Sequence, residues 1–87
     1  MNVKKNKKII LKSLAKHVRK LRGGQSQFML SSENDISPSI ISTVERAKKD
    51  PQCTTLFKLA EALNIKTWQL IKLIEEDLPE DFSLIDK

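Results

Sequence analysis

Aromatic residues and cysteine are scarce in this chain of 87 residues, and each scarcity excludes a kind of structure. Tyrosine is absent, tryptophan occurs once and phenylalanine three times, so the core has to be mostly aliphatic. The single cysteine, Cys53, excludes an internal disulfide and favours a cytoplasmic protein. No apolar run approaches the ~18 residues that span a bilayer, and no apolar segment with a cleavage site follows the basic N-terminus. We therefore expect a cytoplasmic protein without a signal peptide or a membrane partner.

Acidic residues are missing from residues 1–24, which hold nine lysines and arginines. Residues 75–87 reverse this pattern with six acids and one lysine, a local charge of −5 in a chain of net charge +5. The basic segment favours an anionic partner, either nucleic acid or an anionic membrane surface. The acidic segment must lie away from that partner.

Apolar residues recur at helical spacing in five segments with short connections, and no strand pattern is present. The spacing predicts helices over Lys7–Arg22, Gln27–Glu33, Pro38–Arg46, Cys53–Leu63 and Trp68–Glu76. The expected inward residues include Leu11, Leu14, Ala15, Val18, Leu21, Phe28, Leu30, Ser31, Ile40, Ile41, Val44, Leu56, Leu59, Ala60, Leu63, Leu70, Ile71 and Ile74. The fold class is therefore a compact all-α domain over residues 7–78, with a basic arm (1–6) and a short acidic tail (79–87).

Several residues mark where these helices begin and end. Gly23 suits the left-handed position after the first helix, and Asn64 is a candidate cap after the fourth. Ser37 is expected to cap the third helix, with Pro38 in its first helical position, where no backbone donor is needed. Thr67 is expected to cap the fifth helix.

The third segment leaves small polar side chains on its outer face once its isoleucines and valine turn inward. A thin helix of this kind can enter a DNA major groove, which is about 12 Å wide. An ordinary solvated helix face remains the alternative. The residues on this face are Pro38, Ser39, Ser42, Thr43 and Arg46, followed closely by Lys48 and Lys49.

A set of short motifs keeps one register from Ser26 onward: Ser26-Gln27 with Leu30, Ile36-Ser37, Ile41-Ser42, Val44-Glu45-Arg46, Lys48-Lys49-Asp50-Pro51 and Thr55 to Ile65. Through these motifs, residues 11–74 resemble the helix-turn-helix domain of the phage-repressor-like (Xre, lambda repressor and Cro-like) transcriptional regulators. The resemblance implies a compact five-helix, lambda-repressor-like fold with the helix-turn-helix at helices 2 and 3. Four features depart from the family pattern: a shorter link after the first helix, Gln25 at a buried leucine position, Asp35 where glycine with positive φ is common, and Pro38 at a base-contacting position.

The resemblance also implies roles for individual residues. Ser39 and Thr43 are the main candidates for contacts with base edges, Ser42 for base or phosphate, and Pro38 for a thymine methyl group. Phosphate contacts are expected from Ser26, Gln27, Arg46, Lys48 and Lys49. A capping role for Gln27 and a solvated loop for the two lysines are the alternatives. Arg22 and Glu45 are expected to form a structural ion pair.

No residue set suggests an enzyme, a metal site, a cofactor or a small-molecule ligand. His17 and Cys53 are single, and we expect a residue at the core boundary and a small apolar residue, respectively.

The leading interpretation is a sequence-specific double-stranded DNA-binding transcriptional regulator, acting as a homodimer on two half-sites. The expected dimer surface is the fifth helix and the tail, and the apolar residues of the tail are expected to dock on the first or fifth helix. In that arrangement the tail acids would lie near the lysines of residues 4–8. The alternative is a protein-interaction module, such as an antitoxin-like or adaptor partner, in which DNA binding is secondary. The expected dimer surface rests on apolar residues that exceed what one small core needs, namely Trp68, Leu78, Phe82, Leu84 and Ile85.

Overall fold

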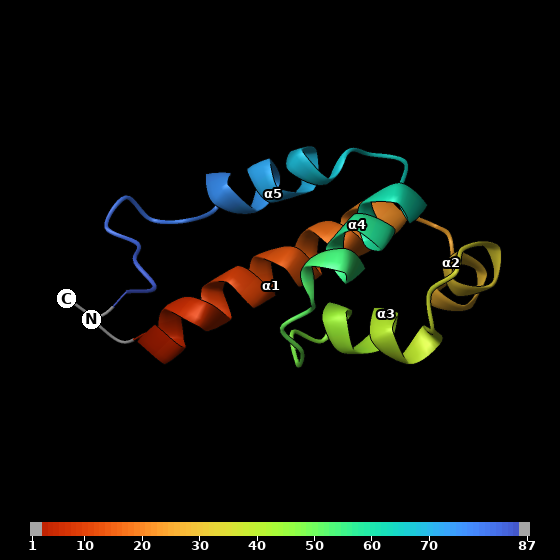
Figure 1. Ribbon diagram of the computed structural model, residues 1–87, viewed down its shortest axis with the longest axis horizontal. Coiled ribbons are helices and arrows are strands. Elements are labelled where there is room, and N and C mark those ends of the chain that lie inside the picture. Colours follow the sequence, from red (N-terminus) through yellow and green to blue (C-terminus); the bar gives the residue numbers. More distant parts are fainter. Residues whose placement is uncertain (1–2, 86–87) are drawn as a thin grey trace.

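The computed structural model describes residues 3–85, and the regular structure within them is entirely helical (Figure 1). The all-α class and the five segments predicted from the sequence are therefore confirmed. The helices are α1 (Val3–Arg22), α2 (Gln27–Glu33), α3 (Pro38–Glu45), α4 (Cys53–Ala62) and α5 (Thr67–Glu76).

The longest helix, α1, runs through the molecule and organises the others around it (Figure 1). It packs against α3 and against α5, while α2 packs on α3 and α4 packs on α5. The N-terminal half of α1 extends beyond α3 and α4, and the chain that follows α5 returns to its beginning (Figure 1). This arrangement gives the molecule its elongated shape, with extents of 43 × 22 × 22 Å.

The core is aliphatic, as the scarcity of aromatic residues predicts. Every helix contributes to it, so the two short helices α2 and α3 are stabilised by tertiary burial; helices under ~12 residues are marginal alone. The largest fully buried side chains are Leu30, Ile41, Leu59, Leu70, Val18 and Val44.

The capping signals predicted at the end of α1 and the start of α3 are present, and α2 has an unpredicted cap at Ser26. Ser26 and Ser37 each accept a hydrogen bond from the backbone three residues on, at Met29 and Ile40. Pro38 takes the first position of α3, and Gly23 has φ +58 directly after α1. These local features fix where the chain enters the α2–α3 unit.

Several predicted boundaries are wrong. α1 begins at Val3 instead of Lys7, because the polar first turns carry no apolar pattern and still form helix readily. α3 and α4 end one residue earlier than predicted, with Arg46 and Leu63 as their C-caps. Thr67 is the first residue of α5 and not its cap, because the Gln69 side chain accepts from the Lys66 backbone at 2.8 Å and caps the helix one residue earlier.

Left-handed backbone follows α4 at Asn64, the predicted cap, and follows α3 at Ala47, where it was not predicted. Asp35 does not have positive φ; among the non-glycine residues that the structure describes, Ala47 (φ 55) and Asn64 (φ 62) have it. Both directly follow the C-cap of a helix. The backbone of Lys48 donates to Thr43 and that of Ala47 donates to Val44, each at 3.0 Å, which is the Schellman arrangement.

Two residues expected in the core are exposed. Phe28 is 70% exposed, since it lies two residues from the buried Leu30 and therefore about 200° around α2. Leu21 shares the face of Leu14 but lies in the last turn of α1, and 36% of its surface is exposed. Cys53 is also exposed and is not packed as an apolar residue.

Candidate nucleic-acid interface

The turn between α2 and α3 is fixed by its own side chains. Ile36 is buried in the core, and its carbonyl accepts from the Ser31 hydroxyl at 2.7 Å. The Asn34 amide donates to the Leu30 carbonyl at 2.9 Å. Because the turn is hydrogen-bonded to α2 and its Ile36 side chain is buried in the core, α3 has a defined angle to α2.

The four residues predicted to contact base edges lie on one accessible side of α3. Pro38 and Ser39 are exposed and Ser42 and Thr43 are half-buried, whereas Ile41 is buried on the opposite side. The surface of α3 that faces solvent is therefore formed by small side chains, as predicted.

Two of the three hydroxyl groups on this face are hydrogen-bonded within α3 or to its N-cap. Thr43 Oγ1 donates to the carbonyl of Ser39 (2.9 Å) or of Ile40 (3.1 Å). Ser39 Oγ lies 2.8 Å from Ser37 Oγ. Each oxygen retains acceptor capacity, and the Thr43 methyl group is available for an apolar contact. The face can thus present acceptors and small apolar groups without rearranging the helix.

Basic residues follow the C-terminus of α3. Arg46, Lys48 and Lys49 are all exposed. The Arg46 guanidinium donates to the Ser42 carbonyl at 3.3 Å, and within residues 3–85 the two lysines form no ion pair. Asp50, the next residue, pairs with Lys7 of α1 at 3.4 Å. The loop therefore presents three cations beside the small-residue face.

Glu45 is the buried centre of a network that connects three helices. It is 4% exposed. Arg22 at the end of α1 donates to both of its carboxylate oxygens at 2.7 Å, and Gln27 at the start of α2 donates to Oε1 at 3.0 Å. Arg19 donates to the Glu45 backbone carbonyl. The ion pair that the resemblance implies is thus present, with Gln27 as a further member.

Ionisation of Glu45 is favoured by these partners. Burial alone would raise the pKa of its carboxyl group, but the hydrogen bonds from Arg22 and Gln27 and the charges of Arg22 and Arg19 outweigh burial and lower that pKa. The hydrogen bond to Glu45 raises the pKa of Arg22. The network therefore stays charged and fixes α3 relative to α1 and α2.

Gln27 occupies a different position from the one its expected phosphate contact requires. Its side-chain amide points into the Glu45 network instead of outward. Ser26 caps α2 through its hydroxyl, with Met29 N at 3.0 Å. Both residues lie at the start of α2, but here their side chains serve the fold.

A row of lysines follows the exposed side of α1, which contains no acidic residue. We call Lys4, Lys8, Lys12, Lys16 and Lys20 the lysine row; all five are exposed and none contributes to the core. Like charges four residues apart destabilise a helix by roughly 0.2–0.5 kcal/mol per pair, and cations in the first turn oppose the helix dipole. The charge of residues 1–24 predicts a basic segment, but it does not predict where the lysines lie on the helix.

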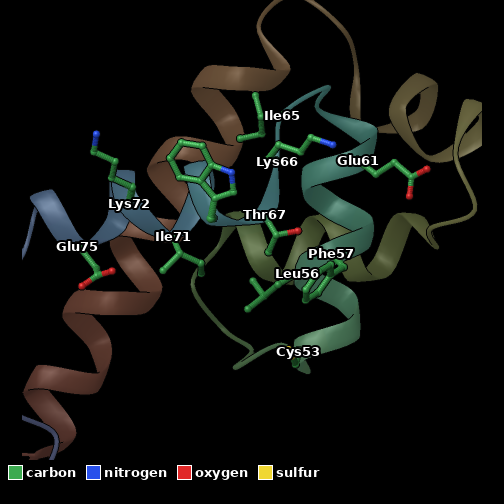
Figure 2. Close-up of a pocket in the computed structure, with 11 residues that line it drawn as sticks. Cys53, Leu56, Phe57, Glu61, Ile65, Lys66, Thr67, Ile71, Lys72 and Glu75 are labelled. Atoms are coloured by element: carbon green, nitrogen blue, oxygen red, sulfur yellow. The ribbon is translucent and has the colours of Figure 1, made fainter.

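An apolar groove lies between α4 and α5, on a part of the surface separate from α3 (Figure 2). Its volume is about 1060 Å³. Phe57 of α4 and Trp68 of α5 line it and are 58% and 64% exposed. The sequence singled out Trp68 but not Phe57. The other lining residues are Cys53, Leu56, Ile65, Thr67 and Ile71, with Glu61, Lys66, Lys72 and Glu75 as charged members.

The chain after α5 docks on α1 of the same subunit. Leu78 lines a small cavity of about 240 Å³ together with Leu11 and Leu14. The Asn6 side chain donates to the Ser83 carbonyl at 2.8 Å. Leu84 and Ile85 stay exposed. The segment after α5 therefore returns to the first helix, one of the expected arrangements, but the expected docking of Leu84 and Ile85 does not occur.

Asp77 anchors the end of α5 to the middle of α1. Its Oδ2 accepts from Lys16 and lies 2.8 Å from the nitrogen; it also accepts from Ser13 at 2.6 Å and lies 2.8 Å from His17 Nε2. The hydrogen bonds from Lys16, Ser13 and His17 hold the pKa of Asp77 well below its usual range. Asp77, one of the acids of residues 75–87, thus pairs with Lys16, outside the expected range of lysines 4–8.

None of the helices within residues 3–85 has the length and apolar character that a membrane crossing requires. Across the same residues, no three histidine, cysteine or acidic side chains gather where a metal ion would bind.

No family model, no curated protein and no solved structure matches this chain. Its function is therefore inferred from the residues and geometry of the α2–α3 unit and its surroundings.

Proposed function

We propose that this chain is a lambda-repressor-like, sequence-specific DNA-binding transcriptional regulator, and that it acts as a homodimer on an operator with two half-sites. The supporting observation is the accessible face of α3. Its small side chains have exposed cations at one end, and the helix behind them is fixed through the buried Glu45. A thin helix that is held in place and has cations at one end has the form that enters a major groove.

Different residues of this surface contact bases and phosphates, because their side chains differ in size and charge. Ser39 and Thr43 contact base edges, Ser42 contacts base or phosphate, and Pro38 offers only apolar contact. Arg46, Lys48 and Lys49 contact phosphates, which fix the register of the protein on the duplex without distinguishing sequences. The start of α2 contributes backbone N–H groups to phosphate, since the Ser26 and Gln27 side chains are engaged in the fold.

The groove between α4 and α5 supports the homodimer. One recognition helix contacts only a few base pairs, so two subunits are required for an operator of useful length. The groove carries two acids and two lysines around an apolar centre. Such a surface is self-complementary in charge, which is what an isologous twofold interface needs.

The same groove supports a second candidate function. Phe57 and Trp68 are the kind of aromatic side chains that anchor protein interfaces. The groove would then receive a different protein, as in an antitoxin-like or adaptor partner, and DNA binding would be secondary.

Selection of duplexes from a random pool by the purified chain tests the proposed function. We expect enrichment of a sequence with two related half-sites. Thr43→Ala should weaken binding to that sequence by roughly 1–3 kcal/mol and relax one base position per half-site. Lys48→Ala should weaken binding to all duplexes alike and reduce the salt slope by about one unit.

The two candidate functions give different results in this experiment. A chain that enriches no sequence, although it binds a protein through the groove, would support the second candidate. If Thr43→Ala lowered affinity equally for all duplexes, the assignment of Thr43 to base contacts would be wrong.

A further inference from the structure

The lysine row has no role in the core, in the α3 surface or in the groove. From Lys4 to Lys20 its members recur every four residues, and all of them are exposed. We propose that the lysine row binds the phosphate backbone of the duplex next to the base pairs that α3 contacts. This inference rests on the proposed function and extends it by a second contact surface on α1.

The row begins on the side of α1 that α3 occupies. Lys4 and Arg22 are 18 residues apart, which is five turns at ~3.6 residues per turn, so they lie on one line of the helix. Arg22 on that line pairs with Glu45 of α3. The N-terminal half of α1 projects past the end of α3 (Figure 1). A duplex lying along α3 would therefore continue past Lys4 and its neighbours.

The N-terminal part of the row suits a duplex. Steps of four residues at ~1.5 Å and ~100° per residue place successive lysines about 6 Å apart along the axis and turn them about 40° around it, so Lys4, Lys8 and Lys12 stay within about 80° of one another. One strand presents a phosphate every ~3.4 Å of helix axis, so these three lysines, about 12 Å from first to last, cover the rise of about three to four base pairs. The flexible lysine side chains accommodate the mismatch between the two spacings.

Most of the charge of the row is uncompensated within the protein. Lys16 pairs with Asp77 at 2.8 Å, whereas Lys4, Lys8, Lys12 and Lys20 have no ion pair within residues 3–85. Helix α1 also lacks any acid that would interleave with them. Neighbouring like charges that the fold leaves unrelieved are relieved by an external polyanion. Local electrostatic conflict of this kind is expected at functional sites.

Nucleic acid fits this surface better than an anionic membrane does. A basic helix that binds membranes inserts its apolar face among the lipids. The apolar face of α1 is not available for insertion, because Leu14 and Val18 are buried in the core at 3% and 0% exposure. The row therefore offers charge alone, which matches a phosphate backbone.

The test compares two variants by the change in salt slope per substituted lysine. Lys8→Gln/Lys12→Gln alters the row, and Lys58→Gln removes an exposed lysine of α4 that lies outside the groove. Both are compared with the wild-type chain for binding to the selected sequence and to random duplex between 50 and 200 mM salt. All three proteins are used at concentrations where sedimentation shows the same oligomeric state.

We expect the row variant to reduce the salt slope by about 0.9 per lost phosphate contact, so by about 1.8 per bound subunit. The loss of affinity should be equal for the selected and the random duplex, and the preferred sequence should not change. The control variant should keep the wild-type slope. Without DNA, the row variant should melt no lower than the wild type, because it removes like-charge repulsion; unfolding is thereby excluded as the cause.

Failure of this inference differs from failure of the proposed function. A preferred sequence together with an unchanged slope in the row variant would refute the lysine row alone. Binding without any preferred sequence, weakened in the row variant, would support the row and refute sequence-specific regulation. Binding to phosphatidylserine vesicles but to no duplex would refute both.

Discussion

The ion pair between Arg22 and Glu45 is the single-residue contact on which the position of α3 most depends. Glu45 is almost completely buried, whereas the Arg22 side chain is 19% exposed. Removing the arginine leaves a buried carboxylate without its charged partner, which costs far more than the pair contributes when intact.

Arg22→Ala should therefore lower the free energy of unfolding by about 3 kcal/mol, the low end for a buried pair because Arg22 is partly exposed. Urea unfolding at neutral pH measures the change. Arg46→Ala, which removes an exposed arginine, is the control and should change stability by less than about 0.5 kcal/mol. A wild-type midpoint in Arg22→Ala would show that Glu45 does not require its partner.

The same variant should respond differently to pH. Because the folded pKa of Glu45 lies below its unfolded value of 4.5, its ionisation stabilises the wild type above that value. The contribution is lost as pH falls through the folded pKa. Without Arg22, burial dominates and the carboxyl group protonates more readily. The difference in stability between the two proteins should shrink as pH falls below about 4.5.

Ala47 carries backbone strain that glycine would remove. Its φ of 55 lies in the left-handed region, where a side chain costs roughly 1 kcal/mol. Ala47→Gly should therefore raise the free energy of unfolding by about 0.5–1 kcal/mol. Asn64→Gly is the matched control at the end of α4 and should give a smaller gain, because asparagine tolerates this conformation. Equal effects of the two substitutions would contradict this explanation.

At the scale of elements, Asp77 connects the end of α5 to α1. Asp77→Asn removes the charge that Lys16 and His17 contact, so the variant should melt at a lower temperature. The folded pKa of Asp77 lies below its unfolded value of 3.8, so its contribution is present above that pH and lost as pH falls below it. The melting temperatures of the variant and the wild type should therefore converge below about pH 3.8.

Hydrogen exchange locates the effect of Asp77→Asn. The amides at the end of α5 and in the segment after it should exchange faster, while those of α3 should not change. Equal acceleration throughout the chain would mean that Asp77 supports the whole fold and not the α5–α1 contact.

The helices could be predicted from the sequence because their signals are local. The cap at Ser37 and the stripe through Leu14 and Val18 depend only on near neighbours along the chain. After Val3, the first turns of α1 contain only polar residues, so periodicity gives no signal there. The sequence predicts Phe28 in the core, but it is exposed. Tertiary packing, and not local spacing, decides which face of a seven-residue helix is buried.

The candidate site was predictable to the same extent. The small-residue face of α3 follows from its spacing, and the ion pair between Arg22 and Glu45 was suggested by resemblance. The hydrogen bond from Gln27 to Glu45 was not predicted, because a partner 18 residues away depends on how α2 meets α3. The groove was missed for the same reason, since it forms only where Phe57 and Trp68 come together from different helices.

At the scale of the whole molecule, opposite charges are concentrated in different segments of the chain, and the acidic segment after α5 returns to the start of α1. Cations occupy α1 and the loop after α3, while most acids lie after residue 74. A polyanion approaching α3 therefore meets the basic side, and the groove between α4 and α5 remains available to a second subunit. The proposed homodimer requires that these two surfaces act together.

Substitution in the groove tests that requirement. Trp68→Lys places a charge in the apolar centre of the proposed interface, so it should shift the protein from dimer to monomer in sedimentation. Affinity for the two-half-site duplex should fall strongly, because each subunit then binds separately, while affinity for a single half-site should stay near the wild-type monomer value. Trp68 is already 64% exposed, so the fold of the monomer should be retained.

Phe28→Lys is the matched control, since Phe28 is similarly exposed but lies on α2, outside the groove. It should leave the dimer intact. In a two-fold interface between α5 helices, Lys72 of one subunit can meet Glu75 of its partner, so Lys72→Glu should weaken the dimer by placing acids opposite one another. The double variant Lys72→Glu/Glu75→Lys restores the pairing and should recover the dimer. Recovery would identify α5 as the contact, whereas a dimer unaffected by Trp68→Lys would move the interface to another surface.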